Sequence, residues 1–237
     1  MKSLARAFAA AALVGVLAGC AGPVPKVDVS AEKIATVKTI AVIRTPEPKT
    51  YTVANFGHPG MLFGAIGGLV AAADQSAKQN ELSAAFHQRQ SAISSHLADE
   101  VAAQLRTAGF EVRVEEGPWE EADGKFNLKF ENITSSADAV LVVSPTIVGF
   151  ISPRMGSDYL PTMTAVATLV GKDRKEQLYR GFHSYGFQPK AEGWKSTAPK
   201  ATFSDFQVLM ADPNAAVHSL EDAGMAIARS VSADLKH

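Results

Sequence analysis

The sequence predicts an α/β (α+β) fold, in which helices pack on a mixed sheet of four or five strands. Short continuous apolar runs at 40–43 and 139–143, bounded by charged or turn-forming residues, are typical of strands buried inside a sheet. Apolar side chains that recur every three or four residues along 91–109 and 212–235 are typical of helices with one buried face. The two patterns alternate along the chain, as they do in α/β proteins.

The first half of the domain is predicted to run strand, insertion, helix, strand. The first strand covers 36–44 and ends before a Pro-Glu-Pro sequence. The helix that follows the insertion ends at Gly109, a residue that favours a helix terminus. Residues 110–114 then alternate between apolar and charged side chains, which predicts a half-buried strand.

The middle of the chain is predicted to hold a turn-rich stretch, a short helix and a long buried strand. Residues 117–124 are rich in turn-forming types, and 130–134 follow as a short helix. The strand begins with the apolar run at 139 and continues to 151.

The last third is predicted to form a β-hairpin and then helices. Segments 162–170 and 177–187 read as strands, and the charged link between them is short enough for a hairpin. A short helix is predicted at 203–210. Asp212 at the cap and Pro213 at the first helical position then begin the final helix.

An apolar, glycine-rich insertion at about 55–90 interrupts this order. Gly60, Gly64 and Gly68 recur every fourth residue, which on a helix forms a smooth stripe that another helix can approach closely. The pattern is similar to the glycine zippers of some envelope proteins. The uncharged run 61–73 is too short to cross a bilayer as a helix. It can cover the domain, associate with a second copy or dip into a membrane.

The amino terminus has the order of a secretory signal. Lys2 and Arg6 precede an apolar run at 7–18, which small residues close like a processing site. The sequence Leu17-Ala18-Gly19-Cys20 resembles the lipobox of bacterial lipoproteins. That resemblance implies removal of 1–19 as a signal peptide, with signal-peptidase recognition by Leu17, Ala18 and Gly19. It also implies a diacylglycerol group and palmitate-type acyl chains on Cys20.

The lipobox implies three segments and a location. Residues 1–19 are the signal, 20–35 the lipidated cysteine and a flexible tether, and 36–237 a single periplasmic domain. Cys20 is the only cysteine, so it has no intrachain disulfide partner. Ala21 stands where Asp would retain a Gram-negative lipoprotein in the inner membrane. The resemblance therefore implies lipid anchoring to the cell outer membrane, on its periplasmic face.

Charge argues against nucleic acid as a partner. Without 1–19 the chain keeps 21 Lys and Arg against 24 Asp and Glu, whereas nucleic-acid-binding domains are strongly basic. The expected partners are the membrane, through the lipid anchor, and a protein partner or further copies of the chain.

No pattern in the sequence predicts an enzyme. Residues 182–186, Phe-His-Ser-Tyr-Gly, lack the first glycine of a nucleophile elbow and fall in a predicted hairpin strand. The six histidines show no metal-ligand spacing, and there is no Gly-rich phosphate-binding motif. We therefore expect no catalytic residues, no metal and no cofactor other than the covalent lipid on Cys20.

The element order over 36–237, without the insertion, resembles the amino-terminal domain of TolB. Similar small α/β folds occur in the curli secretion lipoprotein and in the lipoproteins that activate penicillin-binding proteins. These relatives imply a non-catalytic envelope protein that binds a partner or assembles with itself. A subunit of a secretion or pore-like complex is the alternative, and a cell-wall or lipid hydrolase is a second one. An exposed apolar face on 61–73 would favour the first two over the hydrolase.

Overall fold

The computed structural model describes residues 25–60, 64–187, 189 and 192–236. The predicted signal peptide, its recognition residues and Cys20 lie outside these residues. Part of the predicted tether lies within them, and Val27 forms an antiparallel bridge with Arg180 through two backbone hydrogen bonds of 3.0 and 2.8 Å. A short helix follows, α2 (Ala31–Ile34). The chain is therefore attached to the sheet from Val27 onward.

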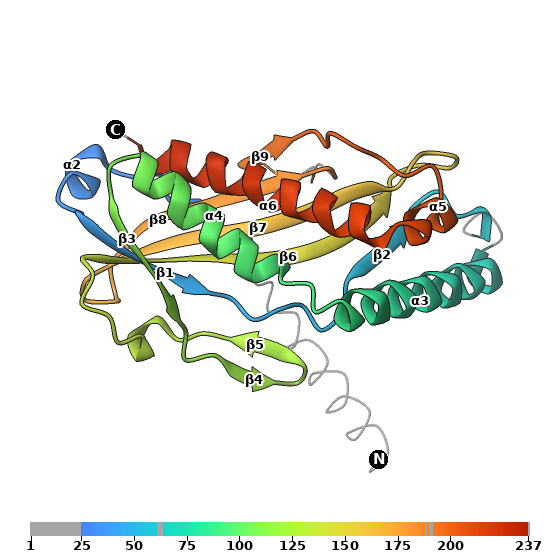
Figure 1. Ribbon diagram of the computed structural model, residues 1–237, viewed down its shortest axis with the longest axis horizontal. Coiled ribbons are helices and arrows are strands. Elements are labelled where there is room, and N and C mark those ends of the chain that lie inside the picture. The colour runs from blue at the N-terminus through green and yellow to red at the C-terminus, as the bar shows by residue number, and fades with distance from the viewer. Residues whose placement is uncertain (1–24, 61–63, 188, 190–191, 237) are drawn as a thin grey trace, which may run out of the picture.

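The predicted α/β class is confirmed, with a larger sheet than expected. The strands of the main sheet are β1 (Thr39–Arg44), β2 (Thr52–Asn55), β3 (Glu111–Glu116), β6 (Ala139–Ser152), β7 (Leu160–Gly171), β8 (Gln177–Tyr185) and β9 (Trp194–Thr197). In the described residues they form one mixed seven-stranded sheet of order β3-β1-β6-β7-β8-β9, in which β2 also pairs with β6 (Figure 1). The two strands without a sequence prediction, β2 and β9, are only four residues long.

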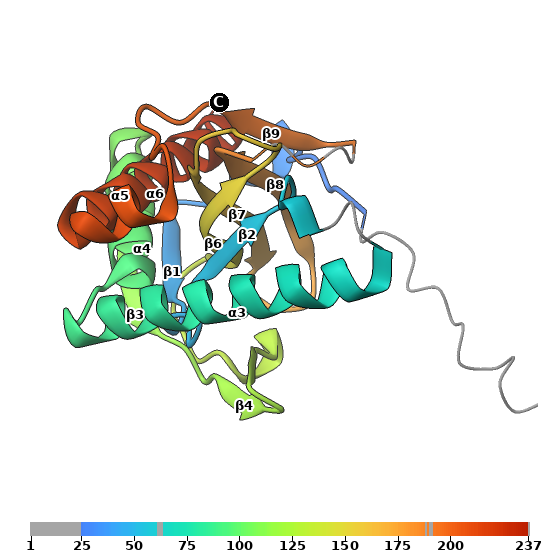
Figure 2. The same ribbon diagram turned by 90° about the vertical axis from the view of Figure 1, so that its right-hand side faces the viewer.

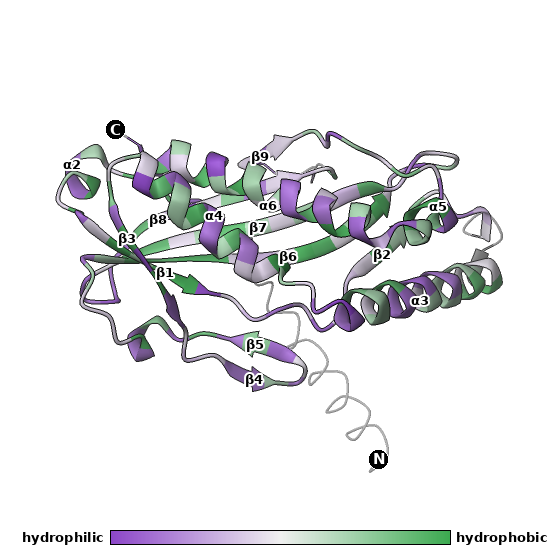
Figure 3. Ribbon diagram, viewed as in Figure 1, coloured by the Kyte–Doolittle hydropathy of each residue, from purple (hydrophilic) through white to green (hydrophobic). Residues whose placement is uncertain are grey.

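The long strand β6 organises the sheet. Its first residues pair in parallel with β1, and its last four pair in parallel with β2. Along its other edge it pairs with β7, and β7 pairs with β8, both antiparallel as the predicted hairpin requires. A β-carbon on Gly149 would lie 1.9 Å from the carbonyl oxygen of Thr52, so only glycine permits β2 to approach at this point. Figure 3 shows hydrophobic residues along β6 and β7.

Two long helices cover one face of the sheet, α4 (Ile93–Thr107) and α6 (Pro213–Leu235) (Figure 1). The predicted ends are confirmed, because Gly109 has a φ of 102° and the Asp212 side chain accepts hydrogen bonds from two amides of the first turn of α6. The apolar stripe of α6 points into the core, where Leu220, Ile227 and Val231 are buried. The helical spacing of the apolar residues therefore predicted both helices correctly.

The opposite face of the sheet is covered by a small hairpin region that the sequence analysis did not predict. Strands β4 (Glu120–Ala122) and β5 (Lys125–Asn127) pair antiparallel around Asp123 and Gly124, both with positive φ. A short 3-10 helix, η2 (Phe130–Asn132), follows where a short helix was predicted. Beneath this region lies a second apolar cluster, made of Ala41, Ile43, Ile133, Ala137, Val140, Val142 and Val170.

Two further helices lie at the end of the sheet where β6 finishes, α3 (Gly64–Gln88) and α5 (Phe206–Ala211) (Figures 1 and 2). The predicted insertion at about 55–90 thus contains α3, a helix of 25 residues, and begins where β2 ends. α3 contacts β2 and α6. It lies across the end of the sheet and not on either of its faces (Figure 2).

Candidate functional site

The helix α3 has a packed half and an exposed half. In the carboxyl-terminal half, Leu82 and Phe86 are fully buried, and the Phe86 ring meets the Tyr51 ring edge-on at 4.8 Å. In the amino-terminal half, Ile66, Leu69 and Val70 are 80%, 73% and 59% exposed. These three residues lie three and four positions apart, which places them on one side of the helix. We call them the apolar face of α3.

The predicted glycine stripe is only partly present. Gly64 and Gly68 lie in α3, but Gly60 precedes the helix, and a β-carbon on Gly60 would lie 2.5 Å from the carbonyl oxygen of Gly67. Gly60 therefore packs against the first turns of α3, and the role of the three glycines in association stays a prediction. A β-carbon on Gly68 would have no neighbour within 4 Å.

Hydrogen bonds hold the exposed half of α3 against the loop that precedes it. The Gln75 side chain donates to the Asn55 carbonyl at 3.1 Å, and within the loop the Gly60 amide donates to His58 Nδ1 at 3.0 Å. Asp74 lies 2.7 Å from the Lys78 ammonium and 3.6 Å from His58 Nε2. The apolar face is therefore presented on a helix that is fixed at its first polar residues.

Two more exposed apolar side chains lie at this end of the molecule. Phe56, 51% exposed, belongs to the loop before α3, and its ring centre lies 5.7 Å from that of Phe187. Met155, 57% exposed, belongs to the turn between β6 and β7, and the backbone of this turn meets Gly57. The exposed apolar side chains thus come from three segments that are far apart in the sequence.

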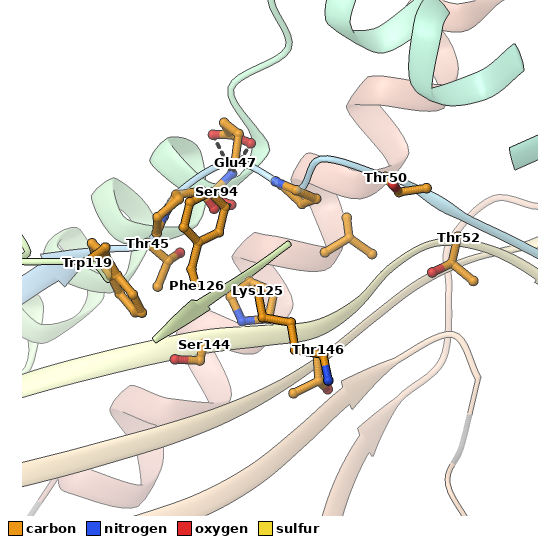
Figure 4. Close-up of a pocket in the computed structure, with 14 residues that line it drawn as sticks. Thr45, Glu47, Thr50, Thr52, Ser94, Trp119, Lys125, Phe126, Ser144 and Thr146 are labelled. Carbon is orange, nitrogen blue, oxygen red and sulfur yellow. Dashed lines mark hydrogen bonds between the residues drawn. The ribbon is translucent and has the colours of Figure 1, made fainter. Parts of the chain in front are cut away.

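A cleft of about 280 Å³ opens on the other side of the sheet, between the 45–52 segment, the hairpin and β6 (Figure 4). Its lining includes Thr45, Glu47, Trp119, Phe126, Ser144 and Thr146. Both Glu47 oxygens accept hydrogen bonds from the Ser94 amide, at 2.9 and 3.0 Å, and one also accepts from the Ser95 amide. Glu47 thereby caps α4, whose own cap position makes no side-chain hydrogen bond.

Two other side chains of the cleft also hold neighbouring segments together. Trp119 donates its indole N–H to the Arg44 carbonyl at 2.8 Å, which joins the hairpin to the end of β1. Thr146 Oγ1 lies 2.8 Å from Thr164 Oγ1 on β7. We therefore assign Glu47, Trp119 and Thr146 a structural role.

A buried polar network that the sequence analysis missed joins β8 to α6. His183 is fully buried, with Nε2 at 2.8 Å from the Tyr179 hydroxyl and Nδ1 at 2.8 Å from the Ser230 hydroxyl. The Tyr179 hydroxyl donates to Asp234 at 2.8 Å, and Asp234 pairs with Lys195. Burial lowers the pKa of His183 to about 4, so the imidazole is neutral at pH 7.

The geometry of this network differs from that of a catalytic triad. In a triad, the carboxylate hydrogen-bonds directly to the imidazole nitrogen opposite the serine. Here the Tyr179 hydroxyl bridges the two groups, and His183 Nε2 lies 3.9 Å from the Asp234 carboxylate. The network fastens the last helix to the sheet.

The described residues contain neither a membrane-spanning helix nor a metal-binding cluster. No described helix combines the length and the hydropathy needed to cross a bilayer. Within the same part of the chain, no three His, Cys, Asp or Glu side chains gather closely enough to hold a metal ion.

Comparisons with known proteins assign no family. No protein-family profile matches the chain, and no curated protein matches it. Among solved structures it is similar to PelC dodecamers from Paraburkholderia phytofirmans, at 13% and 11% identity and TM-scores of 0.40 and 0.39, over 91% of this chain and 100% of PelC. It is also similar to protein XCC0632 from Xanthomonas campestris, at 9% identity and a TM-score of 0.34, over 58% of this chain and 57% of that one.

Proposed function

We propose that this protein is a lipid-anchored, non-catalytic envelope protein that acts by docking on another envelope component. The observation that carries the proposal is the apolar face of α3, where Ile66, Leu69 and Val70 are each more than half exposed. Exposed apolar groups that lie together mark interaction sites in soluble domains. The lipobox-like sequence ending at Cys20 supports an anchor at a membrane, facing the periplasm.

The packing of α3 favours docking over pore formation. Leu82 and Phe86 bury the carboxyl-terminal half of α3 in the core of the domain, and Gln75 and Asp74 join the next turns to the loop at 55–58. A helix held in this way presents one side and keeps its other side in the domain. A ring-forming pore subunit would have to release these contacts to place α3 across a membrane.

Acylation of Cys20 tests the anchor. In a Gram-negative host fed an alkyne analogue of palmitate, we expect the full-length protein to be labelled and to sediment with membranes. Cys20→Ser should lose the label, because the acyl chains have no thiol to join, and should remain unprocessed. Gly22→Ala, two residues beyond the cysteine, is the control and should behave as the parent does. An unlabelled parent, or label that persists in Cys20→Ser, would contradict the proposed function.

A further inference from the structure

We infer that the apolar face of α3 docks on the lipid surface to which Cys20 is anchored. This inference rests on the proposed lipid anchor and names the component on which the protein docks. A lipid surface accepts apolar side chains without a complementary shape or hydrogen-bonding partners, and amphipathic helices lie in it with their apolar side inward. Three observations favour it over other occupants.

The first observation is that the first described residues and the amino-terminal end of α3 lie on the same side of the molecule. In Figure 2 the blue segment with which the described chain begins and the amino-terminal end of α3 both reach the right-hand side of the coloured ribbon. The helices α4, α5 and α6 lie on the left. A flat surface on this side therefore meets α3 first at its amino-terminal end, where the exposed half of the helix begins.

The second observation is the short distance that the connecting chain can span. Pro25, where the described chain begins, follows Cys20 by five residues, which extend over at most about 18 Å. Val27 is already bonded to the backbone of β8. The acyl chains on Cys20 therefore keep this side of the domain close to the headgroups, where even a weak apolar contact is favoured by the high local concentration.

The third observation is the composition of the exposed half of α3. Residues 65–73 contain no charged or hydrogen-bonding side chain, and the first charge after them, Asp74, is paired with Lys78. The helix satisfies its own backbone groups, so it can enter the interface without exposing unpaired amides. This segment is too short to cross a bilayer, so it can enter only the interfacial layer.

A second copy of the chain fits the apolar face less well. From their exposed fractions, Ile66, Leu69 and Val70 offer on the order of 400 Å². A standard protein interface buries about 800 Å² on each partner. Phe56 and Met155 are exposed too, but they stand on loops and not on α3.

Vesicle binding tests the inference independently of lipidation. The mature chain carrying Cys20→Ser is sedimented with phospholipid vesicles at millimolar lipid, beside a variant that also carries Ile66→Ser, Leu69→Ser and Val70→Ser. We expect the parent to partition onto the vesicles and the triple variant to partition at least tenfold less. The three side chains are exposed, so both proteins should have the same circular dichroism spectrum and the same melting temperature.

The matched control is Val208→Ser, which removes an apolar side chain that is 48% exposed on α5. It should bind vesicles as the parent does. Equal binding of parent and triple variant, or no binding by the parent, overturns the inference. A parent that forms a dimer in detergent-free buffer, which the triple variant does not form, also overturns it and assigns the face to a second copy. Whichever of these results is found, the acylation of Cys20 tests the proposed function separately.

Discussion

Replacing Phe86 by Ala is expected to lower the free energy of unfolding by about 3–5 kcal/mol, the usual cost of removing a buried aromatic ring. Phe86 is fully buried and packs on Tyr51, which is fully buried as well. The ring joins α3 to the segment before β2, so its loss leaves a cavity where the helix meets the domain. Urea unfolding followed by circular dichroism measures the change.

The matched control lies on the same helix. Leu69→Ala also removes most of a large apolar side chain. Leu69, however, is 73% exposed, so its removal leaves no cavity in the core. We expect its free energy of unfolding in detergent-free buffer to change by less than about 0.5 kcal/mol. A large loss in Leu69→Ala would show that the apolar face is covered in solution. A small loss of unfolding free energy in Phe86→Ala would show that the carboxyl-terminal half of α3 does not hold the helix against the domain.

Between pH 6.5 and about 4 the protein is expected to lose stability as the pH falls, and His183 should account for much of the loss. Burial between β8 and α6 lowers the pKa of His183 to about 4, whereas an unfolded histidine titrates near 6.5. In this range the unfolded chain therefore binds a proton that the folded chain does not, and each unit of difference is about 1.4 kcal/mol. The full effect is about 3 kcal/mol, present above pH 6.5 and lost by pH 4.

The pH dependence is isolated by comparing variants. His183→Gln removes the titrating group and keeps a side chain that can hydrogen-bond to Tyr179 or Ser230. Its free energy of unfolding should vary less steeply from pH 6.5 to 4 than that of the parent, whatever its value at pH 7. His218→Gln, on an exposed side of α6, should keep the parental slope. Equal slopes for the parent and His183→Gln would show that folding does not lower the pKa of His183.

Sequence patterns predicted the elements whose own residues carry a strong period. The stripes of α4 and α6 and the apolar run of β6 were read correctly because burial on one side, or on both, determines their side chains. β2 and β9 have four residues each and depend on pairing with distant strands. The β4–β5 hairpin did leave a signal, because Asp123-Gly124 is a favoured two-residue turn.

The functional surface was only partly predictable. The run at 61–73 showed an apolar segment, but periodicity does not show whether other elements cover it. The exposure of Ile66, Leu69 and Val70 follows from the position of α3 across the end of the sheet, which depends on the burial of Leu82 and Phe86. The His183 network was missed because its members come from β8, β9 and α6, and Tyr179 and Asp234 are 55 residues apart. The lipidation of Cys20 stays a prediction from the sequence.

The local environment of α3 at a lipid surface tests the central claim most directly. In the Cys20→Ser background, an environment-sensitive fluorophore is attached to Val70→Cys on the apolar face and, as the control, to Ala84→Cys on the exposed side of the packed half. On addition of vesicles we predict a blue shift and stronger emission at position 70, with no change at 84. An unchanged spectrum at position 70, or equal shifts at both positions, would contradict the docking of this face on lipid.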